Sequence, residues 1–148
     1  MILSTLCLSI NLFAYDATLA KHFDKTFSRY SLKYLNHSQM FVDADTTMKM
    51  IRDKRAFILL DIRTPNETSV VGIKTPNTME IPFDKLFKKE NLDKLPKDKP
   101  IVIVCHSGNR ALQAATSLTI LGFENTKVLY GGIVALSKSD STKNAPIE

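Results

Sequence analysis

Cysteine is scarce in this chain, which has two, Cys7 and Cys105, among 148 residues. Cys7 lies in an apolar N-terminal stretch that we expect to be removed, so the mature chain would keep a single thiol. A mature chain of that kind has no intramolecular disulfide. Any thiol chemistry therefore falls to Cys105.

Long runs of one residue kind are also missing. The sequence has no basic block typical of a nucleic-acid tail, no internal repeat and no long low-complexity segment. Its formal charge of +5 supports a general attraction to anions and predicts no nucleic-acid partner. With 24% charged and 44% hydrophobic residues, the composition is typical of a soluble globular chain. The length fits one α/β domain with a full core.

The apolar run at residues 2–14 is too short to cross a bilayer as a helix. Small residues follow at Ala14, Ala17 and Ala20, which is typical of a secretory signal peptide. Residues 1–20 are therefore predicted to be a signal peptide, and the mature protein is expected in the periplasm or outside the cell. Because no Lys or Arg precedes the run, the alternatives are a buried N-terminal element, a membrane anchor or a misassigned start. Those alternatives give a cytoplasmic or membrane-anchored protein.

Residues 21–37 form a basic and aromatic segment with helical spacing. Its basic and aromatic side chains fall on two opposed stripes of a helix, namely Lys21, Lys25, Arg29 and Lys33 against Phe23, Phe27, Tyr30 and Tyr34. Two interpretations stay open. The aromatic stripe packs on the domain, or residues 21–35 make weak contact with a membrane surface or a partner.

Between residues 38 and 136, short β-rich runs alternate with helical patterns, which is typical of a parallel sheet with helices on its faces. The strands are predicted in AFILLDI from residue 56, MEIPF from 79, IVIV from 101 and KVLY from 127. The main helices are predicted after Asp43 or Asp45, from Pro65, and from Arg110 to Gly122. The fold class is therefore α/β, and residues 137–148 are predicted to be a polar tail.

The motif that carries chemistry begins where the strand at residues 101–104 ends. The six loop residues are Cys105, His106, Ser107, Gly108, Asn109 and Arg110. The strand places the thiol at the carboxyl edge of the sheet, and the N-terminus of the next helix favours an anion at the sulfur. Gly108 permits a tight turn and Arg110 supplies a fixed cation. We therefore predict that Cys105 is a nucleophile that reacts as a thiolate.

The loop CHSGNR after IVIV resembles the active-site loop of rhodanese-domain sulfurtransferases. The resemblance extends to LLDIRTPNE at 59–67, the Ile-Pro pair at 81–82 and LGFENTKVLYGGI at 121–133, so it covers about residues 41–136. It implies a rhodanese-like three-layer fold with a parallel sheet of about five strands. It also implies a sulfurtransferase that moves sulfane sulfur from a donor such as thiosulfate to a thiophilic acceptor through a Cys105 persulfide.

The same resemblance assigns roles and partners. Residues 106–109 would offer backbone N–H groups to the persulfide, and Arg110 would close the loop and assist anionic donors. No metal and no organic cofactor are implied, and the partners are small sulfur donors with thiophilic acceptor molecules or an acceptor protein thiol. Two features depart from the family pattern. This chain reads GIKTPN at 72–77 where the family has GHIPGA, and it lacks the aromatic residue that often follows the paired glycines at 131–132.

Asp61, Arg63 and Glu67 follow the strand that begins near residue 56. Charges at a strand end are most often structural, and that is the first interpretation of these three. In the second, Asp61 or Glu67 holds the guanidinium of Arg110 by a bidentate pair. His106 is interpreted as a solvent-exposed loop residue and not as a general base.

Two other functions use the same residues differently. A tyrosine-phosphatase-like or arsenate-reductase-like enzyme also combines a loop cysteine with an arginine, but related phosphatases have five intervening residues where this loop has four. The loop also lacks an obvious acidic residue. A non-catalytic rhodanese-like binding module is the third interpretation, although such modules commonly lose the cysteine that this chain retains.

Overall fold

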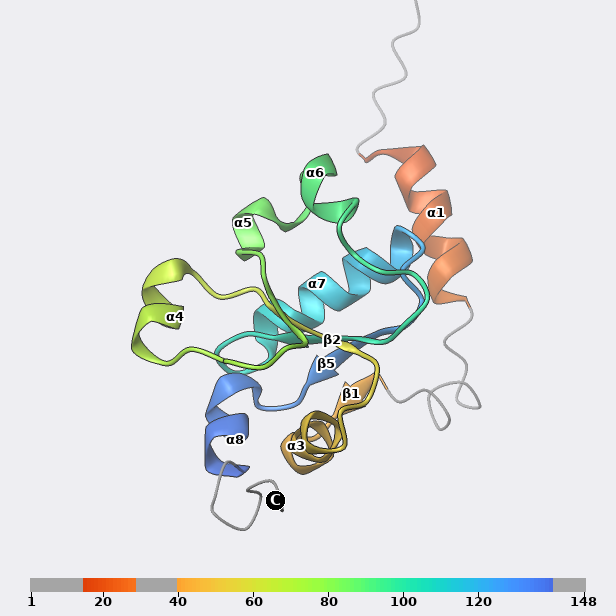
Figure 1. The fold of residues 1–148 in the computed structure, drawn as a ribbon. Helices are drawn as coiled ribbons and strands as arrows, with labels where there is room; N and C mark the ends of the chain where they lie inside the picture. Colours follow the sequence, from red (N-terminus) through yellow and green to blue (C-terminus); the bar gives the residue numbers. More distant parts are fainter. Residues whose placement is uncertain (1–14, 29–39, 140–148) are drawn as a thin grey trace, which may run out of the picture. The chain divides into compact units, whose positions relative to one another are not determined.

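The computed structural model describes residues 15–28 and 40–139. The chain divides into two compact units, residues 1–36 and 37–148. The first contributes one described helix, and the second contains a parallel sheet with its covering helices (Figure 1). We describe each unit by itself.

Five parallel strands form the sheet of the second unit, in the spatial order β1-β5-β4-β2-β3. The strands are β1 (Phe41–Val42), β2 (Ile58–Asp61), β3 (Thr78–Glu80), β4 (Ile101–Val104) and β5 (Thr126–Leu129). The predicted α/β class and the sheet of about five parallel strands are confirmed. Because β4 lies at the centre of the sheet, its four residues are all buried, as its continuous apolar run indicated.

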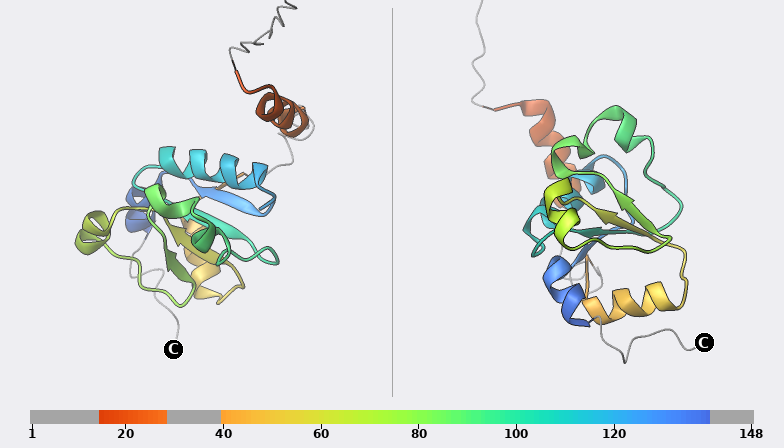
Figure 2. Two further views of the ribbon diagram at one scale, coloured as in Figure 1. Left: turned by 90° about the horizontal axis from the view of Figure 1, so that it is seen from above. Right: turned by 60° about the vertical axis from the view of Figure 1, so that its left-hand side comes forward.

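Helices cover both faces of this sheet and make three layers (Figure 2). One face carries α5 (Phe83–Leu86), α6 (Lys89–Leu92) and α7 (Asn109–Ile120), and the other carries α3 (Ala44–Arg52) and α8 (Gly132–Ser139). The short helix α4 (Pro65–Val70) follows β2 and buries none of its residues.

The core divides into two clusters because successive strand residues point to opposite faces. From the β4 region, Ile101, Ile103 and Cys105 join the cluster that contains the buried alanines of α7. Val102 and Val104 join the cluster on the α3 and α8 side. The cysteine therefore lies on the α7 face of the sheet, directly beyond its central strand.

Local sequence signals fix several helix ends. Asp43, one of the two predicted caps, is the N-cap of α3 and its Oδ1 accepts a hydrogen bond from Thr46 N at 2.7 Å. Pro65 occupies the first turn of α4, as predicted. Gly122 has φ +93° just beyond α7, which is the left-handed cap expected there.

The last helix, α8, was not predicted from the sequence. The polar tail was predicted from residue 137, whereas α8 continues to Ser139. Its Ile133 and Leu136 are buried beside α3, and the Ser139 hydroxyl donates to Asp45 Oδ1 at 2.7 Å. These contacts hold residues 137–139 in a helix against the domain, although their polar sequence indicated a tail.

The helix of the first unit is α1 (Ala17–Phe27), which begins before the predicted start at residue 21. Its N-cap is Asp16, which accepts a hydrogen bond from Leu19 N at 2.9 Å, so the helix crosses the predicted signal boundary at Ala20. Phe23 and Phe27 stack with ring centroids 6.0 Å apart, but the helix buries none of its residues. Packing of this aromatic stripe on the second unit or on another surface stays a prediction, and Tyr30, Tyr34 and most of the predicted signal peptide lie outside the described residues. In the described part of the chain, no helix is long and apolar enough to span a membrane.

Candidate active site

Three strand ends meet at one edge of the sheet, because parallel strands place their carboxyl ends together. β2 ends at Asp61 and leads to Arg63 and Glu67, and β4 ends immediately before Cys105. β5 leads to the paired glycines at 131–132. The topology thus brings together the segments that the sequence motifs singled out.

Cys105 lies beneath its loop at the start of α7 and is only 1% exposed. The backbone N–H of Gly108 donates to the Cys105 sulfur at 3.1 Å. Gly108 is the N-cap of α7 with φ 109°, a conformation that L side chains rarely adopt. A glycine is therefore needed for the turn that aims this N–H at the sulfur, and the site favours negative charge there.

Glu67 and Arg110 close the loop by a bidentate ion pair. Arg110 Nη1 donates to Glu67 Oε2 at 2.9 Å, and Arg110 Nη2 donates to Oε1 at 2.5 Å. The second sequence interpretation is confirmed for Glu67, which holds the Arg110 guanidinium. Such a pair fixes both the position and the orientation of a planar cation.

The Glu67 carboxylate also belongs to a capping box. Its Oε2 accepts hydrogen bonds from Thr64 N at 2.9 Å and Thr64 Oγ1 at 3.0 Å, and Thr64 caps α4 in return. The Arg110 hydrogen bonds and those of Thr64 lower the pKa of Glu67 to about 2. In turn, the Glu67 carboxylate raises the pKa of Arg110, and the Cys105 side chain acts in the same direction. Arg110 is therefore a permanent cation beside the cysteine.

Asp61 does not pair with Arg110, the partner that the sequence analysis considered. Its carboxylate accepts from Arg63 Nε at 2.9 Å and Arg63 Nη2 at 2.6 Å, and both side chains are buried. The alternative in which Asp61 holds Arg110 is therefore wrong. Asp61 and Arg63 are two residues apart at a strand end, and the Asp61 carboxylate also accepts a hydrogen bond from Arg63 N at 3.1 Å, so its hydrogen bonds go to Arg63 and not to the loop.

The remaining loop side chains of His106, Ser107 and Asn109 are exposed. The interpretation of His106 as an exposed loop residue is thereby confirmed. Asn109 is the first residue of α7, so its side chain stands at the helix entrance.

The turn into α8 supports the loop from behind, a contribution that the sequence analysis did not assign. Ile133 N donates to the carbonyl oxygen of Cys105 at 2.8 Å, and Val134 N donates to that of His106 at 3.3 Å. A Cβ on Gly132 would lie 2.5 Å from both carbonyl oxygens. The paired glycines in the sequence indicated a close approach between backbone segments. Only the fold shows that the second segment is the cysteine loop.

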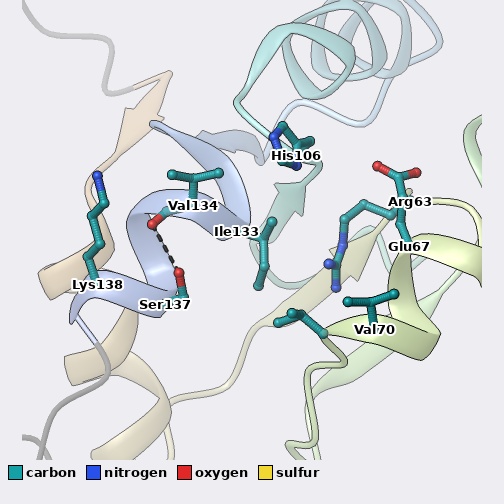
Figure 3. Close-up of a pocket in the computed structure, with 9 residues that line it drawn as sticks. Arg63, Glu67, Val70, His106, Ile133, Val134, Ser137 and Lys138 are labelled. Atoms are coloured by element: carbon teal, nitrogen blue, oxygen red, sulfur yellow. Dashed lines mark hydrogen bonds between the residues drawn. The ribbon is translucent and has the colours of Figure 1, made fainter.

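A pocket of about 390 Å³ opens beside the loop, between α4 and α8 (Figure 3). Its lining includes His106 and Glu67 from the active-site elements, together with Arg63. The sequence analysis missed the other lining residues, because no motif marks them: Val70, Val71, Ile133, Val134, Ser137 and Lys138. In the segment that departs from the family pattern, residues 72–76 line neighbouring hollows instead. Among the described residues, no group of three His, Cys, Asp or Glu side chains is placed to hold a metal ion.

The fold and site together define a parallel α/β protein with a cysteine in an anion-binding loop. The model of the rhodanese-like domain matches residues 43–139. A sulfurtransferase from Allochromatium vinosum is 31% identical over 66% of this chain and 87% of its own length. The chain belongs to the rhodanese-like domain family.

Two further proteins are similar to this chain over the same region. An adenylyltransferase and sulfurtransferase, uba4 of Ogataea parapolymorpha, is 28% identical over 70% of this chain, which corresponds to only 26% of that protein. A rhodanese-related protein from Thermoplasma volcanium has a solved structure with a TM-score of 0.57 and 28% identity, covering 67% of this chain and 91% of that one. Together with the family match, the sulfurtransferase relatives support sulfurtransferase activity in general.

Proposed function

We propose that this protein moves sulfane sulfur from a donor such as thiosulfate to a thiophilic acceptor, with Cys105 carrying the sulfur as a persulfide. The observation that carries the proposal is the Cys105 sulfur at the N-terminus of α7, where it accepts the Gly108 N–H. Arg110, fixed by Glu67, adds a cation beside it. A thiolate and an anionic donor both need such surroundings.

The first half-reaction loads the cysteine. The Cys105 thiolate attacks the outer sulfur of thiosulfate and forms a new S–S bond. The original S–S bond of thiosulfate breaks, and sulfite leaves with its electron pair. Gly108 N–H and the α7 dipole stabilise the negative charge on the sulfur, while Arg110 attracts the dianionic donor.

The second half-reaction removes the sulfur from Cys105. A nucleophile such as cyanide attacks the outer persulfide sulfur, and Cys105 leaves as a thiolate. Thiocyanate is then the product. Because the donor product departs before the acceptor reacts, the kinetics should be ping-pong.

Two observations weigh against the alternatives. The loop has four residues between Cys105 and Arg110, one fewer than in related phosphatases, so it offers a narrower cradle for a tetrahedral phosphoryl group. A binding module needs neither a hydrogen bond to the cysteine sulfur nor a fixed arginine beside it, and this chain has both. The sulfurtransferase reaction uses all of these features.

Substitution of Cys105 tests the proposal directly. Cys105→Ser should abolish thiocyanate formation from thiosulfate and cyanide, since serine cannot hold a sulfane sulfur. Arg110→Ala should keep some activity and lose roughly 1.5–3 kcal/mol of transition-state stabilisation with thiosulfate, the size of a charged hydrogen bond. Steady-state kinetics of the wild type and both variants provide the measurement. Faster turnover of an aryl phosphate than of thiosulfate by the wild type would overturn the proposal in favour of a phosphatase.

A further inference from the structure

Helix α4 contributes no residue to the hydrophobic core. It is six residues long and buries none of them, and Val70 at its end is 82% exposed. A helix of this length is unstable by itself in water, so its place depends on the contacts of its first turn. Glu67 belongs to that turn, and its position therefore depends on the same contacts.

Thr64 follows a residue that is firmly fixed. Arg63 is 3% exposed, and its Nη2 lies 2.6 Å from the carboxylate of the buried Asp61. Thr64 itself is exposed and caps α4. Its backbone is therefore attached to the core through Arg63, while its side chain contacts the helix.

The Thr64 hydroxyl uses both of its hydrogen-bonding capacities on Glu67. It accepts from Glu67 N at 3.3 Å and donates to Glu67 Oε2 at 3.0 Å. Thr64 N donates to the same carboxylate oxygen at 2.9 Å. A capping box consists of the bond to Glu67 N and the bond from Thr64 N, so the hydroxyl donation is an additional contact with the carboxylate.

The orientation of the Glu67 carboxylate decides how Arg110 is held. A bidentate pair requires both carboxylate oxygens to face the two guanidinium nitrogens. Thr64 holds Oε2 from one side, and Arg110 Nη1 donates to the same atom at 2.9 Å. The two paired side chains are 31% and 32% exposed, and pairs of this kind contribute little unless their geometry is well defined. The Thr64 hydroxyl supplies a constraint on that geometry.

We propose that Thr64 is a positioning residue for the sulfur donor. Its hydroxyl orients the Glu67 carboxylate, and the carboxylate orients the Arg110 guanidinium towards the anionic donor at Cys105. Because Thr64 acts through the cation that attracts the donor, its effect falls on the half-reaction with thiosulfate and not on the transfer to the acceptor. This inference rests on the proposed function, because it needs thiosulfate to react with Cys105.

Removal of the Thr64 hydroxyl tests this role. Thr64→Val keeps the branched shape and the backbone N–H, and in ping-pong kinetics kcat/KM for each substrate reports its own half-reaction. The value for thiosulfate should fall by roughly three- to ten-fold, the effect of one lost hydrogen bond, whereas the value for the uncharged acceptor dithiothreitol should change by less than about two-fold. Thr64→Ser keeps the hydroxyl and should restore kcat/KM for thiosulfate to near the wild-type value.

A second pair of variants shows whether Thr64 acts through Arg110. In an Arg110→Ala background the oriented cation is missing, so Thr64→Val should have no further effect on kcat/KM for thiosulfate. A purely structural effect of Thr64 would persist in that background. Equal fold losses with and without Arg110 would therefore overturn the positioning role.

Thr47→Val is the matched control. It makes the same atomic change on α3, where the buried Thr47 hydroxyl donates to the carbonyl oxygen of Asp43 at 2.9 Å. Since α3 covers the face of the sheet opposite α7, this variant should lose stability and keep kcat/KM for thiosulfate. Equal losses of kcat/KM in Thr47→Val and Thr64→Val would assign the effect to stability and overturn the proposal.

The outcomes also separate this inference from the function on which it rests. The mass of the wild type after thiosulfate treatment shows whether Cys105 carries sulfur before any acceptor is added. If sulfur is loaded but Thr64→Val has the wild-type kcat/KM for thiosulfate, the positioning role is overturned and the proposed function stands. If the wild type loads no sulfur, the proposed function fails and this inference fails with it.

Discussion

Glu67 has two roles, one in local structure and one in the candidate active site. Its carboxylate caps α4 through Thr64 and holds Arg110 across 43 positions of sequence. The sequence showed that Glu67 lay near a strand end, and it left open whether Asp61 or Glu67 would reach the arginine. Spacing could not decide this, because the choice depends on how far α4 carries Glu67 from the sheet and on the pairing of Asp61 with Arg63.

The lowered pKa of Glu67 predicts a pH dependence of stability. In the unfolded chain this carboxyl titrates near its ordinary value of 4.5, whereas in the folded protein its pKa is about 2. A depressed folded pKa means that Glu67 contributes its full stabilisation above about pH 4.5 and loses it as the pH falls towards 2. Glu67→Gln lacks this titration, so the difference in free energy of unfolding between wild type and variant should narrow over that range. Urea unfolding at several pH values measures it.

Glu90→Gln serves as the control for this experiment. Glu90 is exposed on α6, and it has no ion pair with any described residue. Its substitution should give a small difference from wild type with no comparable narrowing between pH 4.5 and 2. A Glu67→Gln difference that stays constant across that range would show that the pair with Arg110 does not form in solution.

At the scale of elements, the turn between β5 and α8 helps to position the cysteine loop, together with α7. The N–H groups at the start of α8 bond to the carbonyl groups of Cys105 and His106, and the glycine at 132 lets the two backbones approach. The sequence analysis predicted the strand from residue 127 and noted the paired glycines at 131–132, but it predicted no helix after them. The start of α8 contacts the cysteine loop because the sheet order places β5 beside β4.

Two glycine substitutions separate backbone strain from steric conflict. Gly122→Ala at φ +93° meets nothing within 4 Å, so it should cost about 1–2 kcal/mol of stability from conformation alone and keep activity. Gly132→Ala at φ +58° also places a methyl group 2.5 Å from two carbonyl oxygens of the loop. It should cost about 3 kcal/mol or more and reduce sulfur transfer. Denaturant unfolding and thiocyanate formation are the two measurements, and equal effects of the two variants would contradict the supporting role of the turn.

At the scale of the whole molecule, the alternation of strands and helices predicted most of the domain. Apolar runs such as IVIV located the buried strands, and capping residues located helix starts to within a residue or two. The pocket beside the cysteine loop was not foreseen, because Val70, Val134 and Lys138 come from two helices that are distant in sequence and carry no motif. Residues 137–139 were assigned to a polar tail and not to a helix for a related reason, since Ser139 contacts Asp45 on another helix.

Export of the protein stays a prediction that rests on residues 2–20 of the sequence, and so does weak membrane contact by residues 21–35. If the signal peptide is removed, mass spectrometry of protein from the native cell should find a new N-terminus near residue 21, and that form should occur in the periplasmic or extracellular fraction. An intact Met1 on protein from the cytosolic fraction would contradict the prediction. Since α1 spans the expected cleavage position, the same spectrum also shows whether the complete helix persists in the mature protein.

The measurement that tests the central claim most directly is the intact mass of the purified protein after treatment with thiosulfate and then with cyanide. The account predicts a gain of about 32 Da, the mass of one sulfur atom, that is located on Cys105 and disappears after cyanide. Cys105→Ser should show no gain under the same conditions. A wild-type protein that acquires no cyanide-labile sulfur would contradict the role of Cys105 as the sulfur carrier.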